Sequence, residues 1–184
     1  MTILPLALPL ELEAFTSLPT AKTMVRHLSD MAGYYADQEA VRKLLPGNPL
    51  IYEFTECEYA GQERGLSFGI TRICPGTVGR EYHMTKGHFH LNGGDEIYIA
   101  VRGKGMLVLQ APDGRVESHE MVPGRLHYLP GNWGHRTMNI GEQDFIFLAV
   151  WVPGIEHDYD TVARAGLRKR VLRGKGGAQV VDNP

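Results

Sequence analysis

The chain has 184 residues, a length that fits one domain with terminal extensions, and 43% of them are hydrophobic, enough for a buried core. Its 19 basic and 21 acidic residues give a net charge of −2 without a basic block, which argues against nucleic acid as a partner. The apolar opening, Met1 to Leu10, lacks a basic n-region and is too short to span a bilayer, so we expect neither a signal peptide nor a membrane anchor. The only cysteines, Cys57 and Cys74, have no CxxC spacing, which favours reduced thiols in a cytoplasmic protein.

Helical spacing is found near the start of the chain. Thr20 is a suitable N-cap, and the apolar residues from Ala21 to Ala32 recur at i, i+3, i+4 and i+7, which predicts one amphipathic helix that ends near Gly33. A second short helix is predicted from Asp37 to Leu45, before a Pro-Gly pair. Residues 1–47 are therefore expected to form a mostly helical N-terminal extension.

From residue 48 the pattern changes to that of strands. Short runs rich in Ile, Val, Phe, Tyr and Thr are divided by turn clusters such as Pro75-Gly76. About eight strands over residues 48–152 predict an antiparallel barrel or jelly roll. Residues 153–184 are expected to form a small C-terminal extension, with a helical turn around Asp160 to Ala165 and a hairpin across Gly174 to Gly177. We expect the whole chain, 1–184, to be a single domain.

Three histidines and one glutamate have the spacing of a metal site. In Gly87-His88-Phe89-His90 the strand period of two places both imidazoles on one face. Glu96 follows a turn at Asn92-Gly93-Gly94, so the returning strand can present its carboxylate beside them, with Tyr98 in phase on the same face. His135 begins a later strand after a turn rich in glycine and proline, and would be the fourth ligand.

A lone histidine on a strand is more often a surface residue or a satisfied core residue than a ligand. The complete spacing is more specific, because it resembles the two-part cupin signature. The matching positions are His88, His90, Glu96 and Gly103 in the first part and Gly124, Pro130, His135 and Asn139 in the second. The gap before Glu96 is slightly longer than in many cupins and Asn132 replaces a frequent glycine, but both departures affect turns. This resemblance implies an all-β cupin jelly-roll barrel with short N-terminal helices.

Three neutral imidazoles and one carboxylate leave open positions on a six-coordinate ion. This donor set suits Fe(II), Mn(II), Ni(II) or Zn(II) together with a chelating oxygen ligand. We expect one divalent ion per subunit, with Fe(II) as the first choice. The same set can activate O2, so a non-haem Fe(II) dioxygenase is one alternative function, and a sugar-binding cupin without turnover is another.

Longer motifs give a narrower resemblance. Thr85-Lys86-Gly87-His88-Phe89-His90, Glu96-Ile97-Tyr98 and Gly103-Lys104-Gly105 resemble the cupin-type glucose-6-phosphate isomerases known mainly from archaea and some bacteria. The similarity runs from about residue 22 to the end of the chain and includes Trp133-Gly134-His135-Arg136-Thr137 and His157-Asp158-Tyr159. It implies a homodimeric enzyme that interconverts glucose 6-phosphate and fructose 6-phosphate with a divalent metal at His88, His90, Glu96 and His135.

The same resemblance implies which residues contact the sugar phosphate. The phosphate would lie near Tyr52, Thr71, Thr85, Gly87 and Tyr159, with Tyr98 and His157 beside the sugar. Strict strand alternation instead places Lys86 on the face of His88 and His90, so a bulge or bend at Gly87 is required. As strand and core residues, the threonines and tyrosines could equally have structural roles alone.

Glu96 is the expected base for moving a proton between C2 and C1 through a cis-enediol. Because a bound cation lowers the basicity of a carboxylate, Glu96 would have to loosen from the metal when substrate binds. A direct hydride shift is therefore an alternative. Trp151 stands where archaeal members of the family carry a tyrosine considered a catalytic helper; an indole cannot replace a phenol in proton transfer, so Trp151 is not among the expected catalytic residues.

Overall fold

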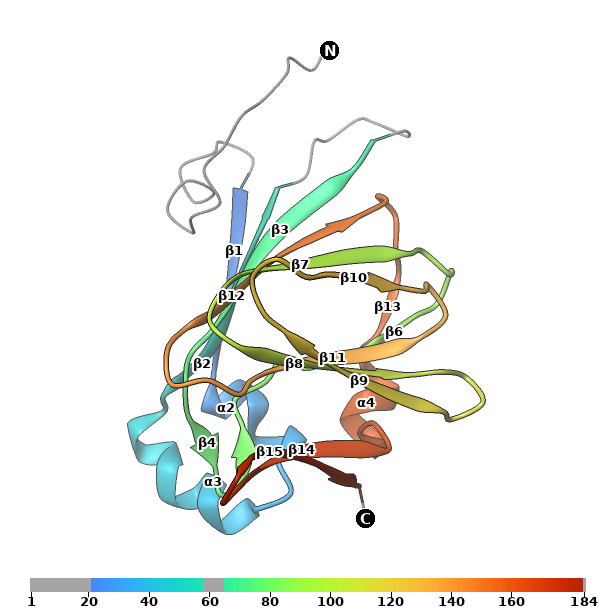
Figure 1. The fold of residues 1–184 in the computed structure, drawn as a ribbon. Coiled ribbons are helices and arrows are strands. Elements are labelled where there is room, and N and C mark those ends of the chain that lie inside the picture. Colours follow the sequence, from blue (N-terminus) through green and yellow to red (C-terminus); the bar gives the residue numbers. More distant parts are fainter. Residues whose placement is uncertain (1–20, 58–64, 184) are drawn as a thin grey trace.

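The structure, a computed structural model, describes residues 21–57 and 65–183, and the expectations for Met1 to Leu10 and for Thr20 lie outside these residues. Strands make up about half of the described chain, and nine of them form the two main sheets of a jelly roll (Figure 1). The prediction of an all-β cupin barrel with short N-terminal helices is confirmed. Within the described ranges no helix is both long and apolar enough to cross a membrane.

The larger sheet has six antiparallel strands. Their order is β1 (Ala21–His27), β2 (Leu50–Cys57), β3 (Ser67–Ile73), β12 (Phe145–Trp151), β7 (Glu96–Arg102) and β10 (Leu126–Leu129). The second main sheet has the order β11 (Gly134–Asn139), β8 (Gly105–Gln110) and β9 (Val116–Met121). Among the described residues of 48–152, the strands of four or more residues are β2, β3 and β7 to β12, in agreement with the predicted eight.

Two smaller sheets complete the fold. One pairs β13 (His157–Asp158) with β6 (Phe89–His90). The other has the order β15 (Gly177–Asp182), β14 (Lys169–Gly174), β5 (Glu81–Tyr82) and β4 (Thr77–Val78). In this four-stranded sheet, β14 and β15 form the predicted C-terminal hairpin, which lies beside the helical segment of the N-terminal part (Figure 1).

The helices are short, and two of the three predicted ones are found. They are α2 (Leu28–Met31), α3 (Gln38–Leu44) and α4 (Tyr159–Ala165), with 3-10 turns at Ala32–Tyr34 and Leu45–Gly47. The predicted second helix corresponds to α3, because Asp37 caps it by accepting the Ala40 N–H at 2.9 Å. The predicted C-terminal helical turn corresponds to α4, which Asp158 caps through the Thr161 N–H.

The prediction of a single helix from Ala21 to Gly33 is wrong for its first half. Residues Ala21–His27 are strand β1, and α2 begins only at Leu28. Seven residues of β1 pair with β2, so tertiary hydrogen bonds override the local helical spacing. The helical face would have buried Met24 and Val25 together, whereas each is 40% exposed in the strand.

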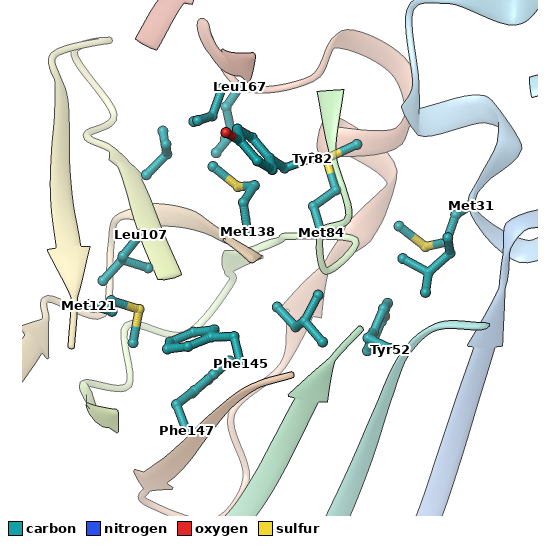
Figure 2. Close-up of a cluster of buried hydrophobic side chains, with 14 of the residues drawn as sticks. Met31, Tyr52, Tyr82, Met84, Leu107, Met121, Met138, Phe145, Phe147 and Leu167 are labelled. Atoms are coloured by element: carbon teal, nitrogen blue, oxygen red, sulfur yellow. The ribbon is translucent and has the colours of Figure 1, made fainter. Parts of the chain in front are cut away.

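A single large cluster of buried apolar side chains joins the barrel to the N-terminal helices (Figure 2). Phe145 and Phe147 of β12 belong to it and stack on each other, with ring centroids 5.5 Å apart. Met31 of α2 and Leu167, which follows α4, are also fully buried in it. Burial of these side chains stabilises the barrel and fixes the segments on either side of β6, where the predicted ligands lie.

Candidate active site

The inner face of the six-stranded sheet forms one wall of a cavity of about 370 Å³. Side chains alternate along a strand, so the residues that face the cavity are two apart. The strand register places them side by side, since Thr71 pairs with Phe147, and Trp151 pairs with Glu96. This wall consists of Met24 on β1, Tyr52, Phe54 and Glu56 on β2, Ser67 and Thr71 on β3, Phe147, Ala149 and Trp151 on β12, and Glu96 and Tyr98 on β7.

The opposite wall contains a bend at Gly87. Its φ of +73° is a left-handed conformation that glycine adopts without steric cost. The bend interrupts the alternation of side chains, and as a result Thr85, Lys86, Gly87 and His88 all line the cavity. The bend that the sequence required at this position is therefore present.

Backbone hydrogen bonds place His88 opposite His135. The His88 N–H donates to the His135 carbonyl at 3.1 Å, and the His135 N–H donates to the His88 carbonyl at 2.9 Å. The two imidazole centroids are 4.4 Å apart. The first and second parts of the predicted signature thus meet in space, as the cupin resemblance implied.

The His90 imidazole is oriented by the turn that follows it. Its Nδ1 lies 2.5 Å from the Gly94 carbonyl, which can only accept, so Nδ1 carries the proton and donates. The other ring nitrogen, Nε2, lies 3.2 Å from His88 Nε2 and 3.3 Å from Glu96 Oε1. A carbonyl that fixes the tautomer in this way is the usual partner of a metal-binding histidine.

Glu96 is a buried carboxylate beside three imidazoles. Its Oε2 lies 3.7 Å from His135 Nε2, and the described residues provide no hydrogen-bond donor to that oxygen. Burial would raise the pKa of Glu96, but side-chain hydrogen bonds from His90 and Tyr98 and the charge of His90, whose own pKa is raised, hold the pKa of Glu96 below its ordinary value. Glu96 is therefore ionised, and its second oxygen is left for a ligand.

His135 is almost completely buried, and its side chain also contacts Tyr98. The Tyr98 hydroxyl lies 3.1 Å from His135 Nε2. Burial lowers the pKa of His135 to about 4, against the opposing charge of Glu96, so the imidazole is neutral at neutral pH. Burial and the Glu96 charge raise the pKa of Tyr98, so its phenol stays protonated. As predicted, Tyr98 and Glu96 face the same side of β7.

His157 lies as close to the predicted ligands as His135 does. It pairs with His90 across β13 and β6, and its ring centroid is 4.2 Å from that of His88. The ligand atoms of four residues lie within 4.8 Å of one another: His88, His90, Glu96 and His157. The sequence placed His157 beside the sugar and His135 in the ligand set. Neither sequence spacing nor strand period could have brought His157 into this cluster, because its position depends on the pairing of β13 with β6.

The donor set fits a divalent cation. Atoms bound at about 2.1 Å and at right angles to one another lie about 3 Å apart. The observed separations of 3.2 Å between His88 and His90 and 3.3 Å between His90 and Glu96 are close to that value. A buried carboxylate oxygen that has no donor among the described residues, beside several imidazoles, is likewise a position that a cation would satisfy.

Every residue assigned to the sugar phosphate by resemblance lies on the cavity wall. They are Tyr52, Thr71, Thr85, Gly87, Tyr98, His157 and Tyr159. Trp151 also lines the cavity, with its ring 6.0 Å from that of Phe54. Phe54, Glu56 and Ser67 were not singled out in the sequence, although the period of two within β2 and β3 relates them to Tyr52 and Thr71.

The close approach at Gly87 gives a testable prediction. A Cβ at this position would lie 2.7 Å from the His135 carbonyl oxygen and 3.0 Å from the Arg136 Cβ. Gly87→Ala should therefore displace the bend, lower the free energy of unfolding in urea by more than about 1 kcal/mol, and weaken metal binding.

Gly124→Ala is the matched control for this change. Gly124 also has a positive φ, +89°, but a Cβ there would meet nothing within 4 Å. This variant should carry the backbone strain alone and retain its metal. If the two variants lose the same stability and both retain metal, the contact with His135 does not set the geometry of the site.

Sequence comparisons identify the family. The family model described as glucose-6-phosphate isomerase (GPI) matches residues 25–183. A glucose-6-phosphate isomerase from Thermococcus kodakarensis is 42% identical over 181 residues, which are 98% of this chain and 95% of that protein. One from Pyrococcus horikoshii is 45% identical over 166 residues, 89% of this chain and 88% of that protein.

A solved structure of Bacillus subtilis oxalate decarboxylase is similar to this chain, with a TM-score of 0.47 and 21% sequence identity. The match covers 55% of this chain and 25% of the decarboxylase chain. That likeness covers about half of the chain, so the family follows from the sequence matches. The chain belongs to the glucose-6-phosphate isomerase family.

Proposed function

We propose that this chain interconverts glucose 6-phosphate and fructose 6-phosphate in the cavity between the six-stranded sheet and the Gly87 bend. The observation that carries the proposal is the buried cluster of imidazoles around Glu96, which opens into a cavity lined by hydroxyl groups. Relatives that share 42–45% of their residues with this chain over most of their length are named for the same reaction.

We infer that one divalent ion per subunit is bound by His88, His90, Glu96 and His135. Fe(II) is the preferred ion. Mn(II), Ni(II) and Zn(II) are alternatives, because a site of neutral imidazoles and one carboxylate can bind any of the four. When bound, such an ion withdraws electron density from adjacent substrate oxygens and stabilises the negative charge of an enediolate.

The substrate would lie across the cavity with its phosphate at the Gly87 bend. Tyr52, Thr71, Thr85 and Tyr159 offer hydroxyl donors there, and Gly87 offers a backbone N–H. Tyr98 and His157 would contact the sugar near Glu96. This arrangement orients the open-chain sugar so that C1 and C2 face the carboxylate.

Glu96 would then move the proton. As an ionised carboxylate it would remove the proton from C2 of the aldose, so that the C2–H electron pair forms the C1–C2 double bond. The electrons of the C1–O1 π bond move onto O1, which takes a proton from solvent to give the cis-enediol. Return of a proton to C1, with loss of the O2 proton, gives the ketose. Because Glu96 is also one of the proposed metal ligands, its carboxylate would have to loosen from the ion to make this transfer.

We further propose that the protein is a cytoplasmic homodimer with a single catalytic domain. Cys57 and Cys74 are both free thiols, as a reducing compartment would leave them.

An assay with metal replacement tests the function directly. The chain is stripped of metal and reloaded with Fe(II), Mn(II), Ni(II) or Zn(II), and formation of glucose 6-phosphate from fructose 6-phosphate is followed in a coupled assay. We expect activity to fall to background after stripping and to return with at least one ion. Absence of activity with all four ions would overturn the isomerase proposal.

Isotope transfer tests the role of Glu96. Glucose 6-phosphate with deuterium at C2 should lose much of its label to water during conversion, since a carboxylate exchanges its proton with solvent before returning it. NMR of the fructose 6-phosphate formed measures the label retained at C1. Complete transfer to C1 under all conditions would instead favour a hydride shift.

Metal content separates the ligands from their neighbours. His88→Ala, His135→Ala and Glu96→Gln should each weaken Co(II) or Mn(II) binding by more than about 100-fold. Even the loss of a residue that only hydrogen-bonds to a metal ligand typically lowers metal affinity by about 10–100-fold. The control His119→Ala, at an exposed position, should bind metal as the wild type does.

The same measurement on His157→Ala distinguishes the two candidate fourth ligands. If His157 contacts the sugar, this variant should retain metal and show a raised KM. If His157→Ala loses metal and His135→Ala retains it, His157 is the fourth ligand and His135 is not. Equal loss in all variants, the His119 control included, would indicate a general effect on stability.

A further inference from the structure

Two cations lie beside the predicted phosphate donors, and the reaction described above leaves both without a role. Lys86 belongs to the Gly87 bend, and Arg26 belongs to the edge strand β1. Neither forms an ion pair with a carboxylate among the described residues. Partly buried cations without a carboxylate partner suggest that an anion completes their surroundings.

Strand register places Arg26 on the cavity side of β1. Arg26 pairs directly with Tyr52, and Met24, two residues earlier, pairs with Phe54. Cross-strand partners project from the same face of a sheet, and Met24, Tyr52 and Phe54 all line the cavity. Among the described residues the guanidinium donates to the Val25 carbonyl at 3.2 Å and to the Met24 sulfur at 3.8 Å, and these two contacts leave most of its five N–H donors for a ligand.

The backbone of Lys86 is fixed by hydrogen bonds, whereas its ammonium lies over an aromatic ring. Its carbonyl accepts two hydrogen bonds from the Arg136 guanidinium, at 3.1 Å from Nε and 2.7 Å from Nη2. Its Nζ lies 5.8 Å from the centroid of the Tyr34 ring. Lys86 is close enough to Arg26 and to Asp30 for the charge of each to act on its ammonium.

The charge of the cavity supports a role in phosphate binding. Lys86 is the only lysine or arginine among the described residues of its wall, while Glu56 and Glu96 are both acidic. Hydroxyl groups alone would leave a phosphate dianion uncompensated in this environment. Tyr52 connects both cations to the predicted phosphate donors. Its hydroxyl accepts a hydrogen bond from the backbone of Lys86, and it is close enough to Arg26 for the charge of the guanidinium to act on it.

We propose that the Lys86 ammonium and the Arg26 guanidinium bind the substrate phosphate together, Lys86 from the Gly87 bend and Arg26 from β1. This inference rests on the isomerase function proposed above. The two cations supply the charge that the hydroxyl donors lack, and they attract the dianion to the mouth of the cavity.

Kinetics of the metal-loaded protein provide the first test. Lys86→Met and Arg26→Gln should each raise the KM for fructose 6-phosphate by roughly 10–100-fold, the usual cost of a hydrogen bond to a charged group, and change kcat by less than about threefold. The decrease of kcat/KM with ionic strength should become shallower in both variants. Lys86→Arg, which keeps the charge, should recover most of the affinity.

The controls remove the same charges elsewhere. Lys175 lies in the exposed turn between β14 and β15, and Arg125 lies at an exposed position before β10. The control variants are Lys175→Met and Arg125→Gln. Both should leave KM and the salt dependence as in the wild type. A loss of kcat without a change of KM in the Lys86 and Arg26 variants would mean that these residues act only through the structure.

Inorganic phosphate provides a measurement that does not depend on turnover. Calorimetry should show phosphate binding to the wild type and at least tenfold weaker binding to the Lys86→Met, Arg26→Gln double variant. If the wild type is active and the double variant binds phosphate equally well, the phosphate role is wrong and the isomerase function stands. If the wild type is inactive with every ion yet binds phosphate through these cations, the function is wrong and the phosphate site stands.

Discussion

The backbone pairing between β11 and the segment before β6 is the constraint on which the rest of the site depends. It begins with the two hydrogen bonds between His88 and His135 and continues where Thr85 N–H donates to the Thr137 carbonyl at 2.9 Å. Gly87 allows the two chains to approach this closely, because any Cβ there would meet the His135 carbonyl. Two of the proposed metal ligands, His88 and His135, and two of the proposed phosphate donors, Thr85 and Gly87, therefore lie along one backbone pairing, which fixes their separation.

This ladder also explains the buried Arg136. Its guanidinium binds the Lys86 carbonyl from beneath the bend, and it lies 5.6 Å from the centroid of the Tyr34 ring. Burial lowers the pKa of Arg136 to about 10, and Glu81 opposes that shift, so the side chain remains a cation below the cavity. A buried cation at this place stabilises a left-handed turn that would otherwise leave the Lys86 carbonyl without a partner.

The period of two made the chemical core of the site predictable from the sequence. His88, His90 and Glu96 are separated by one tight turn, and turn chemistry with strand alternation determines where their side chains point. The bend at Gly87 was also predictable. The family resemblance required Thr85 and Gly87 on the same face as His88 and His90, whereas strict strand alternation places them on the opposite face. Local rules succeed here because the relevant residues are close in sequence.

The rest depends on contacts between distant segments, and local rules fail there. The apolar residues of Ala21–His27 have helical spacing, yet pairing with β2 makes them a strand. That error also concealed Arg26, whose approach to the cavity follows from its register with Tyr52. His157 reaches the imidazole cluster only through the pairing of β13 with β6. None of these pairings has a signature within a window of ten residues.

Trp151 limits how the proton can move. It is the cross-strand partner of Glu96, so its indole occupies the place beside the carboxylate from which a second acid or base would act. An indole N–H donates a hydrogen bond but does not exchange a proton in catalysis, and the ring removes water from the wall it covers. The Tyr98 phenol, the nearest hydroxyl on β7, has a raised pKa because of burial and the charge of Glu96. Glu96 lies among the imidazoles, and its Oε2 has no donor among the described residues, so the proposed transfer between C2 and C1 is assigned to this carboxylate acting in both directions.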